Sequence, residues 1–453
     1  MDQTGCLFDQ QVIDFTPANQ REIEVFDVAG PQQTNNAART RTRVVRFALL
    51  LLVGACVASA CSASRPVAQD PTSVDPTAAS GTLPIVPTTV PIAGLVPVGQ
   101  ASGSAAAEGP VNVYAHAGAG EMSPAVANAK AYVYVPSNDD GSVTVIDQKT
   151  MKVIDHFKAG SLMQHVVPAW DLKTLYATAS GSNRLVPIDP KTGKAGKGIP
   201  VEAPYNLYFT PDGKKAVVMA ERLRRIDFYD RITWKLLQSV PAPCRGVNHA
   251  DWSPDGAWFV ASCEFSGDII KVDTQTGAIL NVLALAPGAM PQDLRLAPDG
   301  SKFYVADMMS AGVWILDAQG TKVIGSIKTG VGAHGIYPSR DASRIYVTNR
   351  GRLAKDTARR SKSGDGSISV VDPTTDKVVD TWKIPGGGSP DMGGVSADGS
   401  TFWVSGRYDD VVYAFDTQTG QLRATISVPG GPHGLAVFPQ PGRYSLGHTG
   451  NYR

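Results

Sequence analysis

The chain has 453 residues, of which 18% are charged, and a formal net charge of +1 at pH 7. A charge this close to zero gives no case for the strongly basic face that nucleic-acid binding requires, so we expect no nucleic acid among its partners. The five cysteines are compatible with an exported protein that carries a disulfide.

Residues 1–40 and 41–61 differ in composition. The first segment is polar, lacks repeat character and contains no second methionine, which indicates an upstream-extended start, with translation beginning near Val44. The second begins with arginines and continues as an apolar run of 14 residues from Phe47 to Ala60, shorter than the ~20 residues of a membrane-spanning helix. Positive charge, a short apolar core and then small residues are typical of a secretory signal.

The end of this signal resembles a bacterial lipoprotein processing site. In Ala58-Ser59-Ala60-Cys61 the cysteine would become the acylated first residue, and Cys56 is the alternative lipidation site. We therefore expect an exported protein of the cell envelope, anchored through lipid on the outer side of the cytoplasmic membrane. Plain secretion is the alternative.

Residues 129–439 contain a unit of about 42 residues that recurs seven times. Each unit ends in a hydrophobic strand closed by an aspartate. These aspartates are 42, 41, 43, 44, 55 and 44 residues apart: Asp147, Asp189, Asp230, Asp273, Asp317, Asp372 and Asp416. A period in the forties, made of short β-type runs and turn residues, predicts an all-β protein, a seven-bladed β-propeller of four-stranded blades.

The ends of the repeat region predict how the ring closes. Tight turns such as Pro254-Asp255-Gly256 separate the first and second strands of a blade. The region starts at a second strand, near Tyr132, and stops after an innermost strand that ends near Phe438. The C-terminal strand is therefore expected to complete the first blade, which removes an exposed sheet edge.

One repeat contains Tyr346-Val347-Thr348-Asn349, the tetrapeptide that names the YVTN-repeat propellers. This part of the chain resembles that family, which is YncE-like, and the resemblance implies the propeller architecture and an exported or surface location. Related propellers include surface-layer repeats, haem d1-handling proteins and lactonases, so the resemblance does not select a function.

Three segments lie outside the regular repeats. Residues 62–128 are largely small residues and proline and are predicted to form a flexible tether. Residues 350–366 are a basic insertion in a loop, either a solvated flap or a contact for an anionic partner. Residues 440–453 are expected to form a tail that folds back across a face of the propeller, and the sequence does not identify which face.

Two cysteines remain in the propeller once Cys6, Cys56 and Cys61 are assigned to the N-terminal segments. Cys244 and Cys263 lie near each other if the intervening hairpin forms, which predicts a disulfide in an oxidising compartment. Two free thiols are the alternative.

Alignment on the innermost strands predicts a ring of polar side chains at one rim of the central channel. One residue per repeat precedes each strand: His165, Asn206, His249, Gln292, His334, Asp391 and His433. Loops on the same face add the ionisable side chains of Glu221, Glu264, Asp307 and Arg407. We expect a ligand site at this channel mouth.

The ring has three interpretations. Each of its side chains is able to bond to backbone at a strand entry, which would make the ring structural. The histidines His165, His249, His334 and His433 are also candidate ligands for a transition metal or haem. A single ion reached by all four requires a narrow channel, so a His433–His165 pair, or His249 with Cys263 and Glu264, is the more credible metal site. A lactonase-like hydrolase would use carboxylate and arginine groups on the same rim: Glu221, Glu264, Asp307, Arg245 and Arg407.

The sequence favours a monomeric scaffold that binds an envelope protein or small ligand at this mouth, without catalysis. A metal- or haem-binding redox protein is the alternative, and a lactonase-like hydrolase is the third candidate.

Overall fold

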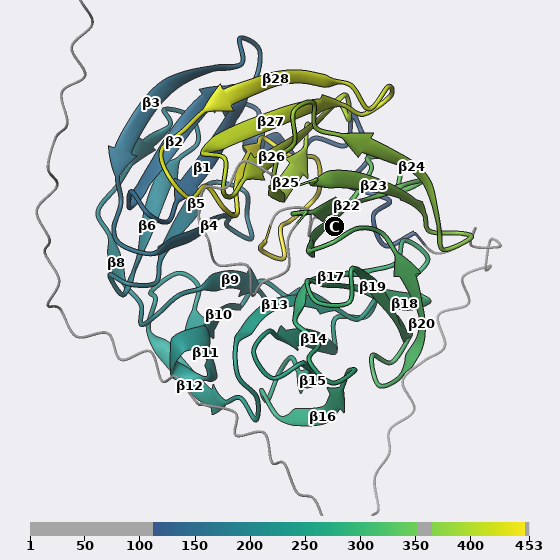
Figure 1. The fold of residues 1–453 in the computed structure, drawn as a ribbon. Helices are drawn as coiled ribbons and strands as arrows, with labels where there is room; N and C mark the ends of the chain where they lie inside the picture. Colours follow the sequence, from purple (N-terminus) through teal and green to yellow (C-terminus); the bar gives the residue numbers. More distant parts are fainter. Residues whose placement is uncertain (1–111, 352–364, 449–452) are drawn as a thin grey trace, which may run out of the picture. The chain divides into compact units, whose positions relative to one another are not determined.

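The computed structural model describes residues 112–351, 365–448 and 453. These residues form an all-β propeller of seven antiparallel sheets arranged around a central channel, as the repeat predicted (Figure 1). The predicted signal peptide, Cys61, Cys56 and most of the basic insertion lie outside the described residues. Within the described part of the chain, no helix is both long and apolar enough to cross a membrane.

The first four blades run from the innermost to the outermost strand. Blade 1 contains β29 (Ala436–Phe438), β1 (Tyr132–Ser137), β2 (Ser142–Asp147) and β3 (Lys152–Lys158). Blade 2 contains β4 (Met163–Pro168), β5 (Leu175–Ala179), β6 (Arg184–Asp189) and two short outer strands, β7 (Lys194–Ala195) and β8 (Ile199–Pro200). Blade 3 contains β9 (Asn206–Phe209), β10 (Lys215–Ala220), β11 (Arg225–Asp230) and β12 (Leu236–Pro241). Blade 4 contains β13 (Val247–Trp252), β14 (Trp258–Cys263), β15 (Asp268–Asp273) and β16 (Ile279–Ala284).

The remaining blades repeat this order. Blade 5 contains β17 (Pro291–Leu296), β18 (Lys302–Asp307), β19 (Gly312–Asp317) and β20 (Val323–Lys328). Blade 6 contains β21 (Ala333–Pro338), β22 (Ile345–Asn349), β23 (Ser367–Asp372) and β24 (Lys377–Lys383). Blade 7 contains β25 (Pro390–Val395), β26 (Thr401–Gly406), β27 (Val411–Asp416) and β28 (Leu422–Ser427). Two short 3₁₀ helices, η1 (Pro124–Val126) and η2 (Glu221–Leu223), complete the described elements.

The ring closes as expected, because the C-terminal strand β29 pairs with β1 in the first blade. Tyr132 lies opposite Phe438 in this pair. The side-chain amide of Gln148 donates to the carbonyl oxygens of both residues, each at 2.9 Å. The first and last parts of the described chain therefore share one sheet, which leaves no exposed innermost edge.

The strand-closing aspartates build the turn between the third and fourth strands. In blade 4, Asp273 Oδ1 accepts a hydrogen bond from the backbone N–H of Thr276 at 2.7 Å, and Asp230 and Thr233 repeat this contact in blade 3. Gly277 follows with a φ of +71°, a conformation that glycine adopts without steric cost. The recurring aspartate is therefore explained by turn geometry.

The innermost strands of blades 2, 4, 5, 6 and 7 contain a bulge, where two residues oppose one residue of the second strand. In blades 2, 4, 6 and 7 a hydroxyl on the second strand bonds to the backbone of the bulge. Thr348 Oγ1 accepts from Gly335 N at 2.8 Å and donates to the carbonyl oxygen of Asp391 in the next blade. Thr178 does the same between His165 N and the carbonyl of Tyr205. The threonine of the YVTN tetrapeptide thus joins neighbouring blades.

Residues 112–128 correct the predicted extent of the tether, because they pack against the propeller. Tyr114 is only 4% exposed, and its hydroxyl donates to the carbonyl oxygen of Leu296 at 2.8 Å. Val113 N donates to Pro298 O, in the turn between β17 and β18. The buried ring and bonded hydroxyl of Tyr114 hold this segment against the propeller, although its composition of mostly small residues predicted a flexible tether.

The C-terminal tail covers the same side of the channel. Ser445 N donates to Trp170 O in the turn between β4 and β5, and the ring of Tyr444 stacks on Trp170 with centroids 5.5 Å apart. Arg453 donates to Ser253 O in the turn between β13 and β14. These contacts place the tail on the face formed by the turns between first and second strands.

Candidate functional site

The bulges place the predicted ring of polar residues at two successive positions along the strands. The bulge pairs are Gln164–His165, Asn248–His249, Gln292–Asp293, His334–Gly335 and Asp391–Met392. His165 and His249 are the second residue of their pairs, whereas Gln292, His334 and Asp391 are the first. Residues that the spacing alone assigned to one rim therefore occupy two different positions along their strands, because a bulge shifts the strand by one residue.

Three histidines meet inside the channel. His165 from β4, His249 from β13 and His448 from the tail are each 0% exposed. One ring nitrogen from each lies within 4.8 Å of those of the other two. The ring centroids are 4.7 Å apart for His165 and His448, and 5.4 Å apart for His249 and each of the others. A zinc ion is bound by imidazole nitrogens at about 2.0–2.1 Å, so small side-chain movements would bring these three nitrogens onto one ion.

Neither ring nitrogen of His165 or of His249 has a hydrogen-bond partner among the described residues. A neutral imidazole carries one N–H donor and one acceptor. A buried polar atom left without a partner costs about 1–3 kcal/mol. Bonds from these imidazoles to backbone therefore do not explain the ring, since the hydroxyls of Thr178 and Ser262 bond to the backbone at these two strand entries.

Two features of the backbone make room for this cluster. Gly434 faces the His165 ring so closely that a Cβ there would lie 1.9 Å from Nδ1. Leu446 O accepts from Phe209 N at 2.9 Å, and Gly447 forms a β-bridge with Tyr208, which positions His448 beside the other two imidazoles. A glycine and a docked tail segment thus bring together residues far apart in the sequence.

Burial keeps the three imidazoles neutral. It lowers the pKa of His165 and of His448 well below the ordinary value, and neighbouring histidines act in the same direction. Burial likewise lowers the pKa of His249. The neutral imidazole is the form that binds a metal ion.

The other two ring histidines contact a buried carboxylate. His433 Nδ1 lies 2.6 Å from Asp391 Oδ2, and His334 Nδ1 lies 3.1 Å from Asp391 Oδ1. Arg350 also pairs with Asp391 Oδ1, through Nη2 at 2.6 Å. His433 Nε2 lies 3.3 Å from the hydroxyl of Tyr205. Burial lowers the pKa of His433 to about 4, although Asp391 acts in the opposite direction.

A chamber of about 310 Å³ opens next to these residues. Its lining is mostly polar or charged: Asp139, Gln164, Tyr205, Glu221, Glu264, Phe265, Gln292, His334, Arg350, Arg407, Tyr408, Asp410, Gly431 and His433. The rings of His165 and Tyr205 are in contact, with centroids 5.4 Å apart, so the histidine cluster is adjacent to the chamber wall.

Several predicted site residues have other partners. Asn206 donates to the hydroxyl of Tyr208 at 3.0 Å and does not line the chamber. Asp307 is 0% exposed and accepts from Met290 N and from the indole N–H of Trp314, so it organises a loop. Cys263 is bonded to Cys244 and is not available as the metal ligand that was expected beside His249.

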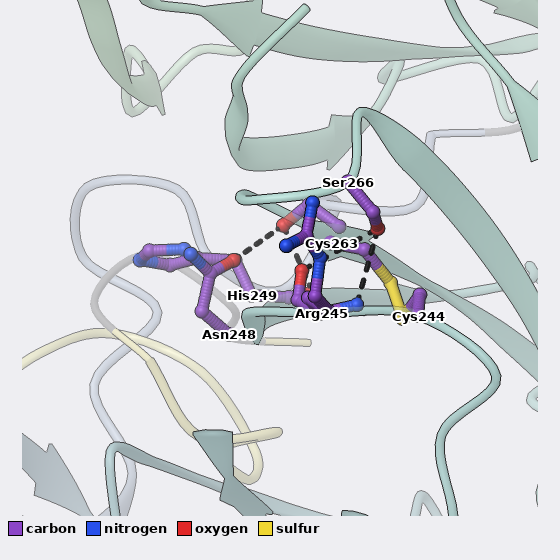
Figure 2. Close-up of a disulfide and its surroundings, with 7 residues drawn as sticks. Cys244, Arg245, Asn248, His249, Cys263 and Ser266 are labelled. Carbon is purple, nitrogen blue, oxygen red and sulfur yellow. Dashed lines mark hydrogen bonds between the residues drawn. A yellow bond between two sulfur atoms is a disulfide. The ribbon is translucent and has the colours of Figure 1, made fainter. Parts of the chain in front are cut away.

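The Cys244–Cys263 disulfide joins the segment just before β13 to the end of β14 (Figure 2). The imidazole of His249 points away from it, towards the channel, while Asn248 Oδ1 accepts from Ser262 Oγ at 2.7 Å. The two cysteines are 19 residues apart, a loop for which the chain-entropy account gives a contribution of roughly 3 kcal/mol to the free energy of unfolding. The bond restrains the segment that presents His249.

Sequence reasoning did not select His448, Tyr205 or Gln164 as site residues. Gln164 and Tyr205 each precede a residue of the predicted ring, and polar pairs such as Gln164-His165 occur at the entry of several innermost strands. This position next to a ring residue is the sequence feature that could have identified them. His448 had no such signal, because only the path of the tail brings it to the channel.

Comparison with known proteins concerns mainly the fold. The family model described as "YNCE-like beta-propeller" matches residues 96–443, and no curated protein matches the chain. A functionally unknown protein from Desulfotomaculum acetoxidans DSM 771 has a TM-score of 0.55 at 15% identity, covering 66% of this chain and 98% of its own. A "putative 6-phosphogluconolactonase" from Bacteroides uniformis ATCC 8492 has a TM-score of 0.54 at 17% identity, covering 67% and 98%. Identities this low show the fold alone.

Proposed function

This chain belongs to the family of YNCE-like beta-propellers, and from that premise we propose that it is a metal-binding propeller, with one copper or zinc ion held by His165, His249 and His448. The family describes an architecture that hosts unrelated functions, so the proposal depends on the site. The site favours a metal-binding protein over a non-catalytic binding scaffold.

One observation carries the proposal: three buried imidazoles converge, and both ring nitrogens of His165 and of His249 have no partner among the described residues. A bound ion would accept a lone pair from each imidazole and offset the cost of burying it. The scaffold and hydrolase interpretations need side chains that a ligand at the channel mouth can touch, whereas His165 and His249 are 0% exposed and do not line the chamber.

The donor set favours copper or zinc. Imidazole nitrogen is a common ligand of both ions, and three histidines provide a set that zinc uses in catalytic centres. Three protein ligands leave at least one position of a tetrahedral ion for water or an exogenous molecule. The adjacent chamber supports access for such a molecule.

The test is elemental analysis with a visible spectrum on the chain purified without a histidine tag from its native envelope. We expect about one copper or zinc ion per chain, removable by a chelator and restored by the same ion. A colourless preparation that neither contains nor takes up metal would reject the proposal. A porphyrin spectrum would support haem in its place.

We also propose that the protein is exported and held at the cell envelope by lipid on Cys61. The disulfide between Cys244 and Cys263 supports an oxidising compartment. The full chain should fractionate with membranes, and Cys61→Ser should release it to the soluble fraction. Membrane association unaffected by both Cys61→Ser and Cys56→Ser would count against the anchor.

A further inference from the structure

The chamber beside the histidine cluster has an excess of acidic groups. Four carboxyl side chains line it: Asp139, Glu221, Glu264 and Asp410. Arg350 and Arg407 are the arginines in its lining, and Arg350 is already paired with Asp391 behind the wall. Four carboxyl groups against two arginines in the lining favour a positively charged occupant.

Two side-chain oxygens of this lining have no hydrogen-bond partner in the part of the chain that the structure describes. They are Gln292 Oε1 and Glu221 Oε1. Gln292 is only 1% exposed, so its oxygen cannot rely on bulk water. A buried acceptor without a donor is costly, which indicates that a ligand with N–H or O–H groups completes the site.

Glu221 and Glu264 interact with each other across the chamber wall. Burial raises the pKa of Glu221 well above its ordinary value, and the neighbouring carboxyl of Glu264 raises it further. Burial also raises the pKa of Glu264, against the opposing effect of Arg350. Glu264 accepts from Asn248 Nδ2 at 3.0 Å, which fixes its position. A bound cation would stabilise the ionised form of both carboxyl groups.

The shape and the aromatic lining match a small organic cation. A volume of about 310 Å³ is at the low end of small-molecule sites. Tyr205, Phe265 and Tyr408 contribute aromatic rings to the lining, and aromatic faces attract ammonium groups. Polar walls exclude a purely hydrocarbon ligand.

We propose that this chamber binds a small organic molecule that bears a primary ammonium group, with the N–H groups donated to Glu221, Glu264 and Gln292. The site is separate from the histidine cluster, and its existence does not depend on a bound metal. Because the two sites are adjacent, an amine in the chamber would lie next to the histidine-bound ion.

The affinity for an amine should depend on pH. The pKa values of Glu221 and Glu264 are raised, so both groups take up protons at higher pH than an ordinary glutamate does. Protonated carboxyls do not attract a cation. Binding should therefore strengthen as the pH rises above the range in which an ordinary glutamate ionises, with Arg222, Arg350 and Arg407 acting against the upward shift and an alkyl ammonium group staying charged.

Calorimetric titration of the full chain with ethylammonium and putrescine tests the proposal, with acetate as the anionic control. We expect saturable binding of at least one amine, no binding of acetate, and affinity reduced at least about tenfold in Glu221→Gln and in Glu264→Gln. Gln292→Leu tests the same site without changing charge. Glu202→Gln, an exposed glutamate paired with Arg225, is the matched control and should bind amines as the unmodified chain does.

Absence of binding by both amines, or equal affinity in Glu221→Gln and the unmodified chain, would overturn the proposal. Binding of calcium chloride in place of the amines would also overturn it, because the chamber would then be an inorganic cation site. His249→Ala separates the two hypotheses. This variant should lose metal uptake and still bind amines. The metal proposal and the amine proposal can therefore fail independently of each other.

Discussion

Replacing His448 by alanine should lower the affinity of the chain for copper or zinc by more than about 100-fold. Replacement of groups that merely support a metal ligand costs 10–100-fold, so loss of a ligand is expected to cost more. His448 belongs to a tail that docks through several other contacts, so its imidazole is removable without removing the tail. Competition with a chromogenic chelator measures the affinity.

Two further variants sharpen this prediction. Gly434→Ala keeps all three histidines but places a methyl group 1.9 Å from the former position of His165 Nδ1, so the ring has to move and the affinity should fall. His116→Ala removes an exposed histidine and should leave the affinity unchanged. Equal metal affinity in His448→Ala and His116→Ala would contradict the assignment of His448.

Replacing Asp391 by asparagine should lower the free energy of unfolding by about 3–5 kcal/mol. Asp391 is 0% exposed and is the buried carboxylate next to Arg350, His334 and His433. Burial by itself would raise the pKa of Asp391, but Arg350 and the two histidines lower it well below the ordinary value, so the group is ionised. Its loss leaves the buried guanidinium of Arg350 without its counter-charge.

Urea denaturation followed by tryptophan fluorescence measures the change. Asp155→Asn is the matched control, because Asp155 pairs with Lys194 at the surface and such pairs contribute at most about 1 kcal/mol. An Asp391→Asn variant no less stable than Asp155→Asn would show that Arg350 is stabilised by other groups. Since the folded-state pKa of Asp391 is depressed, its contribution is present above the unfolded-state value and is lost as the pH falls.

The architecture was predictable because each repeat contains the residues that form its own turns. Aspartates such as Asp273 close a turn within four residues, and glycines such as Gly256 adopt the positive φ that their hairpins require. These interactions are local, so the sequence pattern reports them directly. Seven copies then leave one way to pair the terminal strands, and β29 with β1 follows that expectation.

The candidate site was only partly predictable. The chain shows that polar residues enter the channel once per repeat, and it identified His165 and His249 as possible ligands. It did not show that a bulge puts His165 and His334 at different positions of their strands, because spacing alone does not reveal which residue of a pair is the extra one.

Composition and period by themselves determined the fold class, the number of blades and the residues available to the channel. Only the tertiary structure decided which of them meet. His448 reaches His165 because the tail docks on β9, and Cys263 is removed from the ligand set because its sulfur bonds to Cys244. The contact of His448 with His165 joins residues hundreds of positions apart, and it depends on how the closed ring packs rather than on any local pattern.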